Sequence, residues 1–514
     1  MYSSDTLRLI FGLKIKQLRQ DKGVSAYIVA EQAGLSPSYL NEIEKGKKYP
    51  KSEKIFALAK VLDTDYDTLV SVKLSKRLEP IAELLNSNIL QELPLDLFGL
   101  EPADLLELLS EAPAKVSAFV STLIEISRSH GMNVERFFFS ALRSYRQMHD
   151  NDFPDLETAV ARYRQSLHLT DDEPLTDSAL QTQLENGFGY IVDSFTEADQ
   201  PALARLRSVL LPGNTLPATS SKSSDTPDNQ PMLLFNARLE AEQRAFTFGR
   251  ELGYRVLNLT NRSLVSSVIE AESFEQVLNN FKASYFAGAL LVSRQAIVAD
   301  LRGLFASPVF NPPAWTDLLT RYGITPEVLL SRIMNVLVAE FGIGQAFFLR
   351  FDTADEQTFT LTKELYLSNL RDPHSARHEH YCRRWLSLTI LRELRDVQQN
   401  SVVNNPICRA QRSVFIESGN EYLVITLAKP SPPKPGVNSS VSVGILLDDR
   451  LRSLFPVLND PAIARREVND SCERCRLTDC PERAVQPVIW EQHQRQTEMK
   501  NTIAQLRTWL AIVA

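Results

Sequence analysis

Apolar residues recur at helical spacing through the first 70 residues, and glycines divide them into short runs. The first run covers 7–22 and ends at Gly23, and a second run leads to the turn at Gly34. A third run is closed by Gly46, and a fourth covers 51–62. This pattern predicts about five short helices packed as one all-helical domain over residues 1–75.

The third run has a polar face opposite its apolar one. Ser36 is placed to cap this helix, Pro37 falls in its first turn, and Leu40 and Ile43 supply its buried side. The side chains left pointing outward are Ser38, Tyr39, Asn41, Glu42 and Lys45. A helix this short depends on the packing behind it, so we expect its outer face to contact a partner.

Charge is distributed unevenly along the 514 residues. Net charge is −7, yet residues 1–75 carry 12 Lys and Arg against 9 Asp and Glu, so the remainder carries −10. The lysines concentrate just after the third helix, at Lys45, Lys47, Lys48, Lys51 and Lys54. Such a run is often only a solvated face, but beside an exposed helix it favours contact with phosphates.

The pattern AGLS.SYL..IE.GK..P over residues 33–50 resembles the helix-turn-helix of the XRE/Cro family. The resemblance implies binding to a double-stranded DNA operator. A helical core with accidental turn residues does not explain so specific an arrangement. One departure is Ala26, where many relatives have a phosphate-clamping Gln. The predicted DNA-binding residues are Ser36, Ser38, Tyr39, Asn41, Glu42, Lys45, Lys47 and Lys48.

Residues 76–168 are amphipathic and predicted to be wholly helical. Next to a DNA-binding domain, such helices commonly form a dimer seam, because paired half-sites require two-fold symmetry. A helical spacer packed on its own chain is an equally good interpretation. We therefore expect a spacer or dimerisation region, and a homodimer.

Residues 169–315 contain a Ser/Pro-rich loop (213–231), a strand (232–236) and a long helix (237–257). The segment FTFGRELGY in that helix resembles the zinc helix of ImmA/IrrE-type metallopeptidases. Arg250 and Tyr254 stand at the two histidine positions, Glu251 is kept, and Lys282 occupies the place of the carboxylate ligand. Guanidinium and ammonium groups have no lone pair for zinc. The resemblance thus implies a degenerate, zincin-like scaffold in which Glu251 pairs with Arg250 and Lys282; a working metallopeptidase is the disfavoured alternative.

Beyond residue 315 the pattern alternates between helices and strands. Two helices lead to a strand at 345–351, and a long helix precedes three strands within 412–448. This order predicts an α+β sensing domain of GAF-like type over 316–485, followed by a C-terminal helix over 486–514. The fold class is therefore multidomain, mainly α with α+β.

Three of the five cysteines, Cys472, Cys475 and Cys480, fall within nine residues. An odd number of cysteines argues against a disulfide framework, whereas a C-x2-C-x4-C-P cluster favours a metal site. Cys382 is the natural fourth ligand, with His380 as a substitute and Cys408 as an outsider. A remote fourth ligand and a trailing Pro favour an iron–sulfur cluster over zinc, without excluding zinc.

The order of these parts resembles the short-chain fatty acyl regulator family, to which PrpR- and RamB-like proteins belong. The resemblance implies a transcription factor that senses short-chain acyl-CoA or CoA as its effector, with a [4Fe–4S] cluster in some members. The basic residues Arg371, Arg377, Arg383 and Arg384 are weak candidates for the CoA phosphates. Ordinary surface arginines around a helix start are the simpler interpretation.

No apolar run approaches the ~20 residues of a membrane-spanning helix, and the polar start lacks a signal peptide. The sequence therefore predicts a cytoplasmic protein without a membrane partner.

Besides a DNA-binding regulator and a metallopeptidase, a third class of function is a protein-binding regulator that uses the groove of the peptidase-like domain for a partner.

Overall fold

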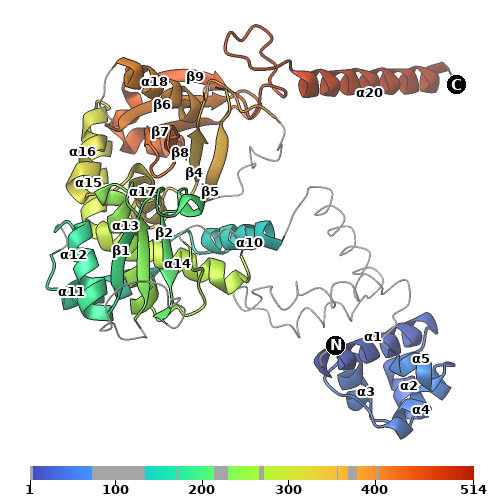
Figure 1. Ribbon diagram of the computed structural model, residues 1–514. Coiled ribbons are helices and arrows are strands. Elements are labelled where there is room, and N and C mark those ends of the chain that lie inside the picture. The colour runs from blue at the N-terminus through green and yellow to red at the C-terminus, as the bar shows by residue number, and fades with distance from the viewer. Residues whose placement is uncertain are drawn as a thin grey trace. The chain divides into compact units, whose positions relative to one another are not determined.

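The computed structural model divides into two compact units (Figure 1). It describes residues 4–71, 134–170, 173–213, 230–265, 271–355, 357–367, 379–400 and 405–513. The part of the predicted 76–168 spacer up to residue 133, most of the loop at 213–231, and Arg371 and Arg377 lie outside the described residues. Within those residues, no helix is long and apolar enough to cross a membrane.

The N-terminal domain consists of five helices, as the glycine-divided pattern predicts. They are α1 (Ser4–Asp21), α2 (Ala26–Gln32), α3 (Pro37–Glu44), α4 (Ser52–Val61) and α5 (Tyr66–Val70). Phe11, Ile15, Leu40 and Ile43 are buried in their common core. A Cβ at Gly12 would lie 2.2 Å from the Ile43 carbonyl oxygen, so α1 packs directly on the backbone of α3.

The first half of the second unit, up to the end of α15 at Ala306, contains a small three-stranded sheet. Its order is β1 (Ile191–Phe195), β3 (Met232–Asn236), β2 (Ser208–Leu211); β1 pairs parallel to β3 and β2 antiparallel to it. The helices of this half are α11 (Pro154–Ser166), α12 (Asp177–Thr182), α13 (Ala241–Val256), α14 (Phe274–Leu291) and α15 (Arg294–Ala306). A further helix, α10 (Val134–Met148), precedes them in the sequence, and its residues up to Tyr145 belong to the first unit. β1 and β2 are absent from the sequence prediction.

Helix α13 begins four residues later than the sequence pattern suggests. Glu240 and Gln243 form a reciprocal capping box, in which each side chain accepts from the other residue's backbone N–H. Residues 237–240 are therefore the turn that leads from β3 into the helix.

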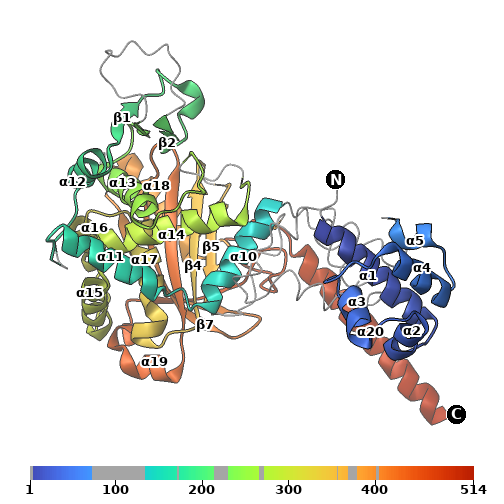
Figure 2. The same cartoon turned by 90° about the horizontal axis from the view of Figure 1, so that it is seen from below.

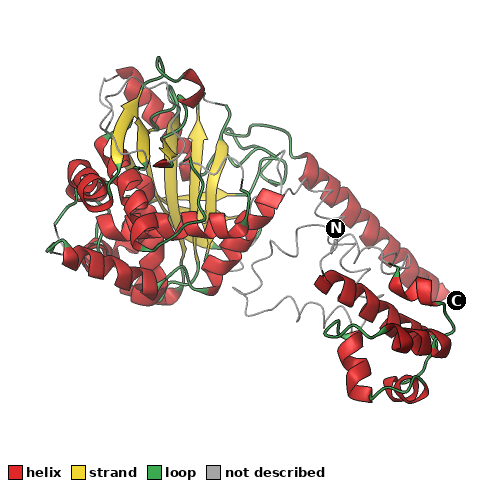
Figure 3. Cartoon of the chain, turned by 60° about the horizontal axis from the view of Figure 1, so that its bottom comes forward, coloured by secondary structure: helices red, strands yellow, loops and turns green. Residues whose placement is uncertain are grey.

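The second sheet has six strands in the order β5-β4-β8-β7-β6-β9. Figures 2 and 3 show its strands lying among helices. Its strands are β4 (Ala346–Thr353), β5 (Thr360–Tyr366), β6 (Ile407–Phe415), β7 (Glu421–Pro430), β8 (Asn438–Leu446) and β9 (Ala464–Val468). Only β9 pairs parallel to its neighbour, β6. The edge strands β5 and β9 are rich in charged and polar residues, and this explains why apolar periodicity does not predict them.

Helices cover both faces of this sheet. Helix α18 (Leu386–Asn400) packs on one face, where Tyr422 and Val424 of β7 join its core. Helix α16 (Pro312–Tyr322) contacts β6. Helix α17 (Pro326–Phe341) contacts β4, β7 and β8. The predicted α+β content is confirmed, whereas a GAF-like type is not.

The chain closes with α19 (Asp449–Leu454), the 3-10 turn η5 (Pro456–Asn459) and the long helix α20 (Val488–Val513). The predicted C-terminal helix is thus present. From residue 492 to 506 its side chains are exposed.

Candidate functional sites

The outer face of α3 is exposed, as the sequence predicts. Ser36 Oγ accepts from Tyr39 N at 3.2 Å, so this hydroxyl caps the helix. Leu40 and Ile43 are fully buried beneath it. Among the predicted DNA-binding residues, the exposed ones are Ser36, Ser38, Asn41, Lys47 and Lys48, and the half-buried ones are Tyr39, Glu42 and Lys45. The exposed face of α3 therefore lies on a helix that is capped by Ser36 and anchored in the core by Leu40 and Ile43.

A buried ion pair orients this helix against α1. Arg19 donates from Nε and Nη2 to the two Glu44 oxygens at 2.7 and 2.9 Å, and from Nη1 to the Val24 carbonyl at 3.2 Å. Hydrogen bonding to Glu44 raises the pKa of Arg19. The pair connects the end of α3, the turn before α2 and α1, which fixes the angle of the exposed face.

Arg250 and Tyr254, which the sequence analysis aligns with zinc-ligand positions, lie buried on α13, and Lys282 lies half-buried on α14. Arg250 and Tyr254 are 7% and 3% exposed, and Tyr254 Oη donates to Asn280 Oδ1 at 3.2 Å. Burial lowers the pKa of Arg250 and raises that of Tyr254, although Arg250 and Arg262 oppose the latter shift. Tyr254 therefore carries its proton at neutral pH, and neither side chain offers zinc a ligand there.

Glu251 takes part in a buried ion pair whose hydrogen-bonded partner is Arg262, a residue that the sequence analysis does not name, while the charge of the neighbouring Arg250 also interacts with Glu251. Both terminal nitrogens of Arg262 donate to its carboxylate at 2.7 Å, and Glu251 is only 1% exposed. The Arg262 guanidinium also lies 3.8 Å from the centre of the Tyr254 ring. Arg262 follows α13 in a loop, beyond the periodic segment, so sequence spacing gave no signal for it.

Small residues hold α13 close to α14. A Cβ at Gly253 would lie 3.0 Å from the Ala283 carbonyl, and one at Gly249 would lie 3.4 Å from the Ala287 Cβ. Such an approach needs the absence of side chains along one stripe of α13. The two helices therefore pack closely next to the Glu251–Arg262 ion pair.

The four predicted metal-ligating cysteines line one pocket. Cys382, Cys472 and Cys475 are buried there, and Cys480 is half-buried. Backbone pairing joins the two segments: Cys472 N donates to the His380 carbonyl at 2.8 Å, and Cys382 N to the Asp470 carbonyl at 3.3 Å. The structure therefore brings remote Cys382 to the cluster, as predicted. Cys408 lies on β6 and is not among the residues that line this pocket.

Within the described part of the chain, no three His, Cys, Asp or Glu side chains are arranged to hold a metal ion. Burial and the neighbouring thiols of Cys472 and Cys475 raise the pKa of Cys382 to about 11. Ala484 N donates to Cys472 Sγ at 3.4 Å. The metal prediction accordingly stays a prediction.

His380, the substitute ligand, is paired elsewhere. Its Nδ1 lies 2.8 Å from Glu473 Oε1, and its backbone N–H donates to the same carboxylate. Of the weak ligand candidates, Arg384 lines the cysteine pocket, as does Arg383, whose guanidinium lies 4.8 Å from the Phe359 ring centre.

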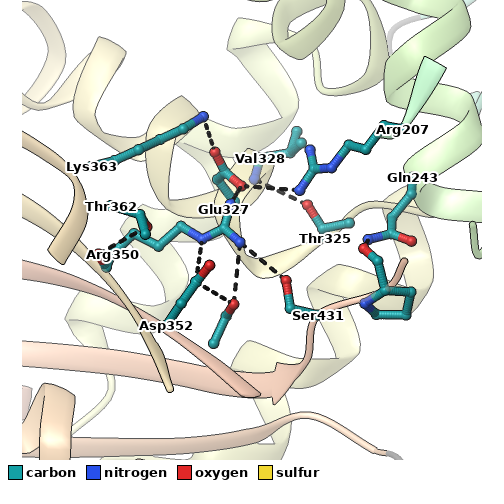
Figure 4. A network of polar contacts seen from close by, with 12 residues as sticks. Arg207, Gln243, Thr325, Glu327, Val328, Arg350, Asp352, Thr362, Lys363 and Ser431 are labelled. Atoms are coloured by element: carbon teal, nitrogen blue, oxygen red, sulfur yellow. Dashed lines mark hydrogen bonds and ion pairs between the residues drawn. The ribbon is translucent and has the colours of Figure 1, made fainter. Parts of the chain in front are cut away.

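A cation-rich network that the sequence analysis missed joins the two halves of the second unit (Figure 4). Glu327, in the first turn of α17, accepts from Arg350 at 2.6 Å and from Lys363, and Arg207 lies 3.9 Å away. Asp352 accepts from Arg350 Nε at 3.1 Å and lies 3.4 Å from Lys434. Four cations thus surround two carboxylates.

The network sets the charge state of Glu327. Burial opposes its ionisation, but Lys363, Arg350 and Arg207 outweigh burial and hold its pKa well below the ordinary value. Glu327, Arg350 and Lys363 come from the consecutive elements α17, β4 and β5, whereas Arg207 lies just before β2, far from them in sequence. No local motif marks them, so only the fold brings them together.

Comparison with known protein families gives two matching family models. Residues 15–69 match "Helix-turn-helix", and residues 214–334 match "IrrE N-terminal-like domain". The chain carries both domains. The predicted XRE-type DNA-binding domain and the IrrE-like domain are thereby confirmed. The second match passes the predicted boundary at 315 and includes α16 and part of α17.

Relatives with curated names include regulators. The chain is 25% identical over 292 residues to a propionyl-CoA carboxylase regulator of Cereibacter sphaeroides, which covers 55% of this chain and 57% of that one. It is 37% identical over 65 residues to SinR of Bacillus licheniformis and of Bacillus subtilis, covering 12% of this chain and 59% of each. The chain therefore spans less than two thirds of these relatives' length.

Among solved structures, a Mycobacterium tuberculosis transcriptional regulator aligns with 18% identity and a TM-score of 0.42, covering 68% of this chain and 93% of that one. A TM-score of that size does not establish a shared fold. The named relatives, and not this solved structure, agree with the predicted resemblance to PrpR-like regulators.

Replacing Arg262 by Met should lower the free energy of unfolding by about 3–5 kcal/mol, because Glu251 would stay buried without its cation. The double substitution Glu251→Gln/Arg262→Met should recover much of that loss. Urea denaturation followed by circular dichroism measures both. As a control, Arg238→Met removes an exposed pair with Glu197 and should cost less than about 1 kcal/mol. Equal effects of the two arginine substitutions would contradict this role.

Glu327→Gln should lower the free energy of unfolding by about 3 kcal/mol near neutral pH, because three cations lose their shared carboxylate. The pKa of Glu327 is depressed in the folded state, so its stabilisation is complete above the ordinary value of 4.5 and declines as pH falls below it. The gap between wild type and Glu327→Gln should therefore narrow in acid. Denaturation at several pH values tests this, with Glu197→Gln as the exposed control. A gap that widens in acid would refute the assignment.

Proposed function

We propose that the chain is a cytoplasmic, sequence-specific transcriptional regulator whose C-terminal half senses a small metabolite, a metal cluster, or both. The observation that carries this proposal is the exposed face of α3 on a domain locked by Arg19 and Glu44. A double-stranded DNA operator is the partner that such a face fits. Two copies of the chain would read two half-sites, so we propose a homodimer.

The name of the Cereibacter relative supports an effector from acyl-CoA metabolism. We propose a short-chain acyl-CoA or CoA as that effector. Its phosphates carry charges that arginines hold in paired hydrogen bonds. Arg383 and Arg384 remain candidates for this role, beside a pocket whose lining also includes Arg483.

The cysteine pocket fits a metal group in its donor set. Four thiols from two segments share one pocket, and a backbone N–H already donates to Cys472 Sγ, as it would to a thiolate. Cys382, Cys472, Cys475 and Cys480 would hold a [4Fe–4S] cluster, or zinc as the alternative. When bound, an iron–sulfur cluster would supply sensitivity to redox state. Binding requires the thiols to lose their protons and draw together, which couples it to local folding.

The cysteine loop, residues 472–483, is hydrogen-bonded to the start of α20 and is held together by Arg483. The Glu473 carbonyl accepts from Ile489 and Trp490 N at 3.1 and 3.0 Å, and Arg483 donates to the carbonyls of Cys472 and Cys475. A change in the loop would therefore alter the first turn of α20. We propose this connection as the first step from sensing to DNA binding.

Proteolysis is not part of the proposal. Arg250, Tyr254 and Lys282 offer zinc no ligand at neutral pH, and Glu251 is held by Arg262. The IrrE-like domain serves instead as the support that joins the sensing half to α11, through an ion pair between buried Arg332 and half-buried Glu157.

Lys47→Ala and Lys48→Ala should each weaken DNA binding and reduce the salt dependence by about one phosphate contact. Fluorescence anisotropy over a range of salt concentrations, on a duplex selected from random sequences, measures this. Lys60→Ala on α4 removes an equally exposed charge away from the recognition helix and serves as the control. Identical salt slopes for all three variants and the wild type would contradict the DNA-binding face.

The protein purified without oxygen should contain iron and sulfide, or zinc. The Cys472→Ser variant should lose this bound metal. Cys408→Ser is the matched control, because Cys408 is buried on β6, where burial raises its pKa to about 12, and should keep the metal. Elemental analysis and an absorption spectrum decide between cluster and zinc. Metal-free wild type, or equal metal content in both variants, would overturn the site.

A further inference from the structure

A second cavity lies on the other side of the six-stranded sheet from α18. It has a volume of about 120 Å³ and is bounded by β7, the end of α15, the start of α16 and η5. Leu423 and Ile425 of β7 form its floor, while their neighbours Tyr422 and Val424 belong to the core under α18. Strand alternation therefore separates this cavity from the cysteine side of the domain.

The lining is mainly apolar. Its members are Gly303, Leu304, Phe305, Ser307, Val309, Phe310, Asn311, Ala314, Trp315, Leu423, Ile425 and Val457. No charged side chain is among them, and Ser307 and Asn311 are the only polar ones. Water needs two to four polar partners in such a space, so most of it suits hydrocarbon better than water.

The loop between α15 and α16 forms the rim. Val309 is 58% exposed and Asn311 is exposed, so the cavity is bordered by solvent-facing residues. Asp460 Oδ2 accepts from Phe310 N at 2.7 Å, and Ser307 Oγ donates to the Val309 carbonyl at 2.7 Å. These bonds hold the loop in place without filling the space beneath it.

The inner wall is rigid. Phe305 is 2% exposed and lies 4.7 Å from Phe455 and 5.6 Å from Phe341, measured between ring centres. Trp315 is buried on the adjoining turn of α16. A void beside fixed aromatic rings cannot collapse easily, and its lining loses dispersion contacts until a ligand enters.

We propose that this cavity binds the hydrocarbon group of a small metabolite. An apolar cavity of about 150 Å³ accepts benzene, so about 120 Å³ suits a hydrocarbon group of up to about six carbons. The uncharged lining excludes an ionised head group, which would stay at the rim near Asn311. The proposal names the ligand chemistry of the sensing half and to that extent rests on the proposed function.

The test uses the full-length chain with benzene and 1-butanol as probes, and saturable binding is followed by ligand-observed NMR and by thermal unfolding. Wild type should bind both probes. Ala314→Leu places a larger side chain in the cavity and should weaken binding at least about tenfold. Thr320→Leu, exposed on the same helix outside the cavity, should bind as wild type does. Circular dichroism confirms that each variant is folded.

A second variant protects the test against a folding failure in the first. Ile425→Ala enlarges the cavity and should favour naphthalene over benzene, which wild type should not do. Absence of saturable binding by wild type, or equal binding by Ala314→Leu and Thr320→Leu, would overturn the proposal. DNA binding by the same samples is measured separately, and its loss in wild type would count against the regulatory function and not against the cavity.

Discussion

The second unit depends on one carboxylate shared among three cations. Glu327 begins α17 and meets Arg207 from the three-stranded-sheet side and Arg350 and Lys363 from the six-stranded sheet. Nearby, Gln243 in the first turn of α13 donates to the Pro432 carbonyl at 2.8 Å, and Lys429 pairs with Glu240. The IrrE-like helix and the six-stranded sheet are therefore joined by a hydrogen bond and an ion pair as well as by the Glu327 network.

This junction gives the IrrE-like domain a physical role. Beside Arg250 and Tyr254, the Glu251 carboxylate accepts hydrogen bonds from Arg262, which lies in the loop after α13. Helix α13 keeps its close packing on α14 and carries the contacts to the β7–β8 turn at its other end. The scaffold thus connects the helices that begin this unit with the half that holds the cysteine pocket and the apolar cavity.

The sequence predicts what depends on local periodicity and on residue chemistry. Ser36 as a cap, Leu40 and Ile43 as buried positions, and the gathering of Cys382 with Cys472 and Cys475 all follow from spacing or ligand chemistry. Edge strands β5 and β9, Arg262 and the Glu327 network do not, because each depends on segments that only the tertiary fold brings together. The cavity is harder still to foresee, since it reflects how side chains fail to fill a space.

The central claim is that the state of the C-terminal half controls DNA affinity. Its most direct test is the dissociation constant of the full-length chain for one selected duplex, measured for metal-loaded protein and for the same protein after removal of the metal. The account predicts a difference of at least about fivefold, the lower end of ordinary coupling between two sites. Equal dissociation constants in the two states, for folded protein at the same salt concentration, would contradict it.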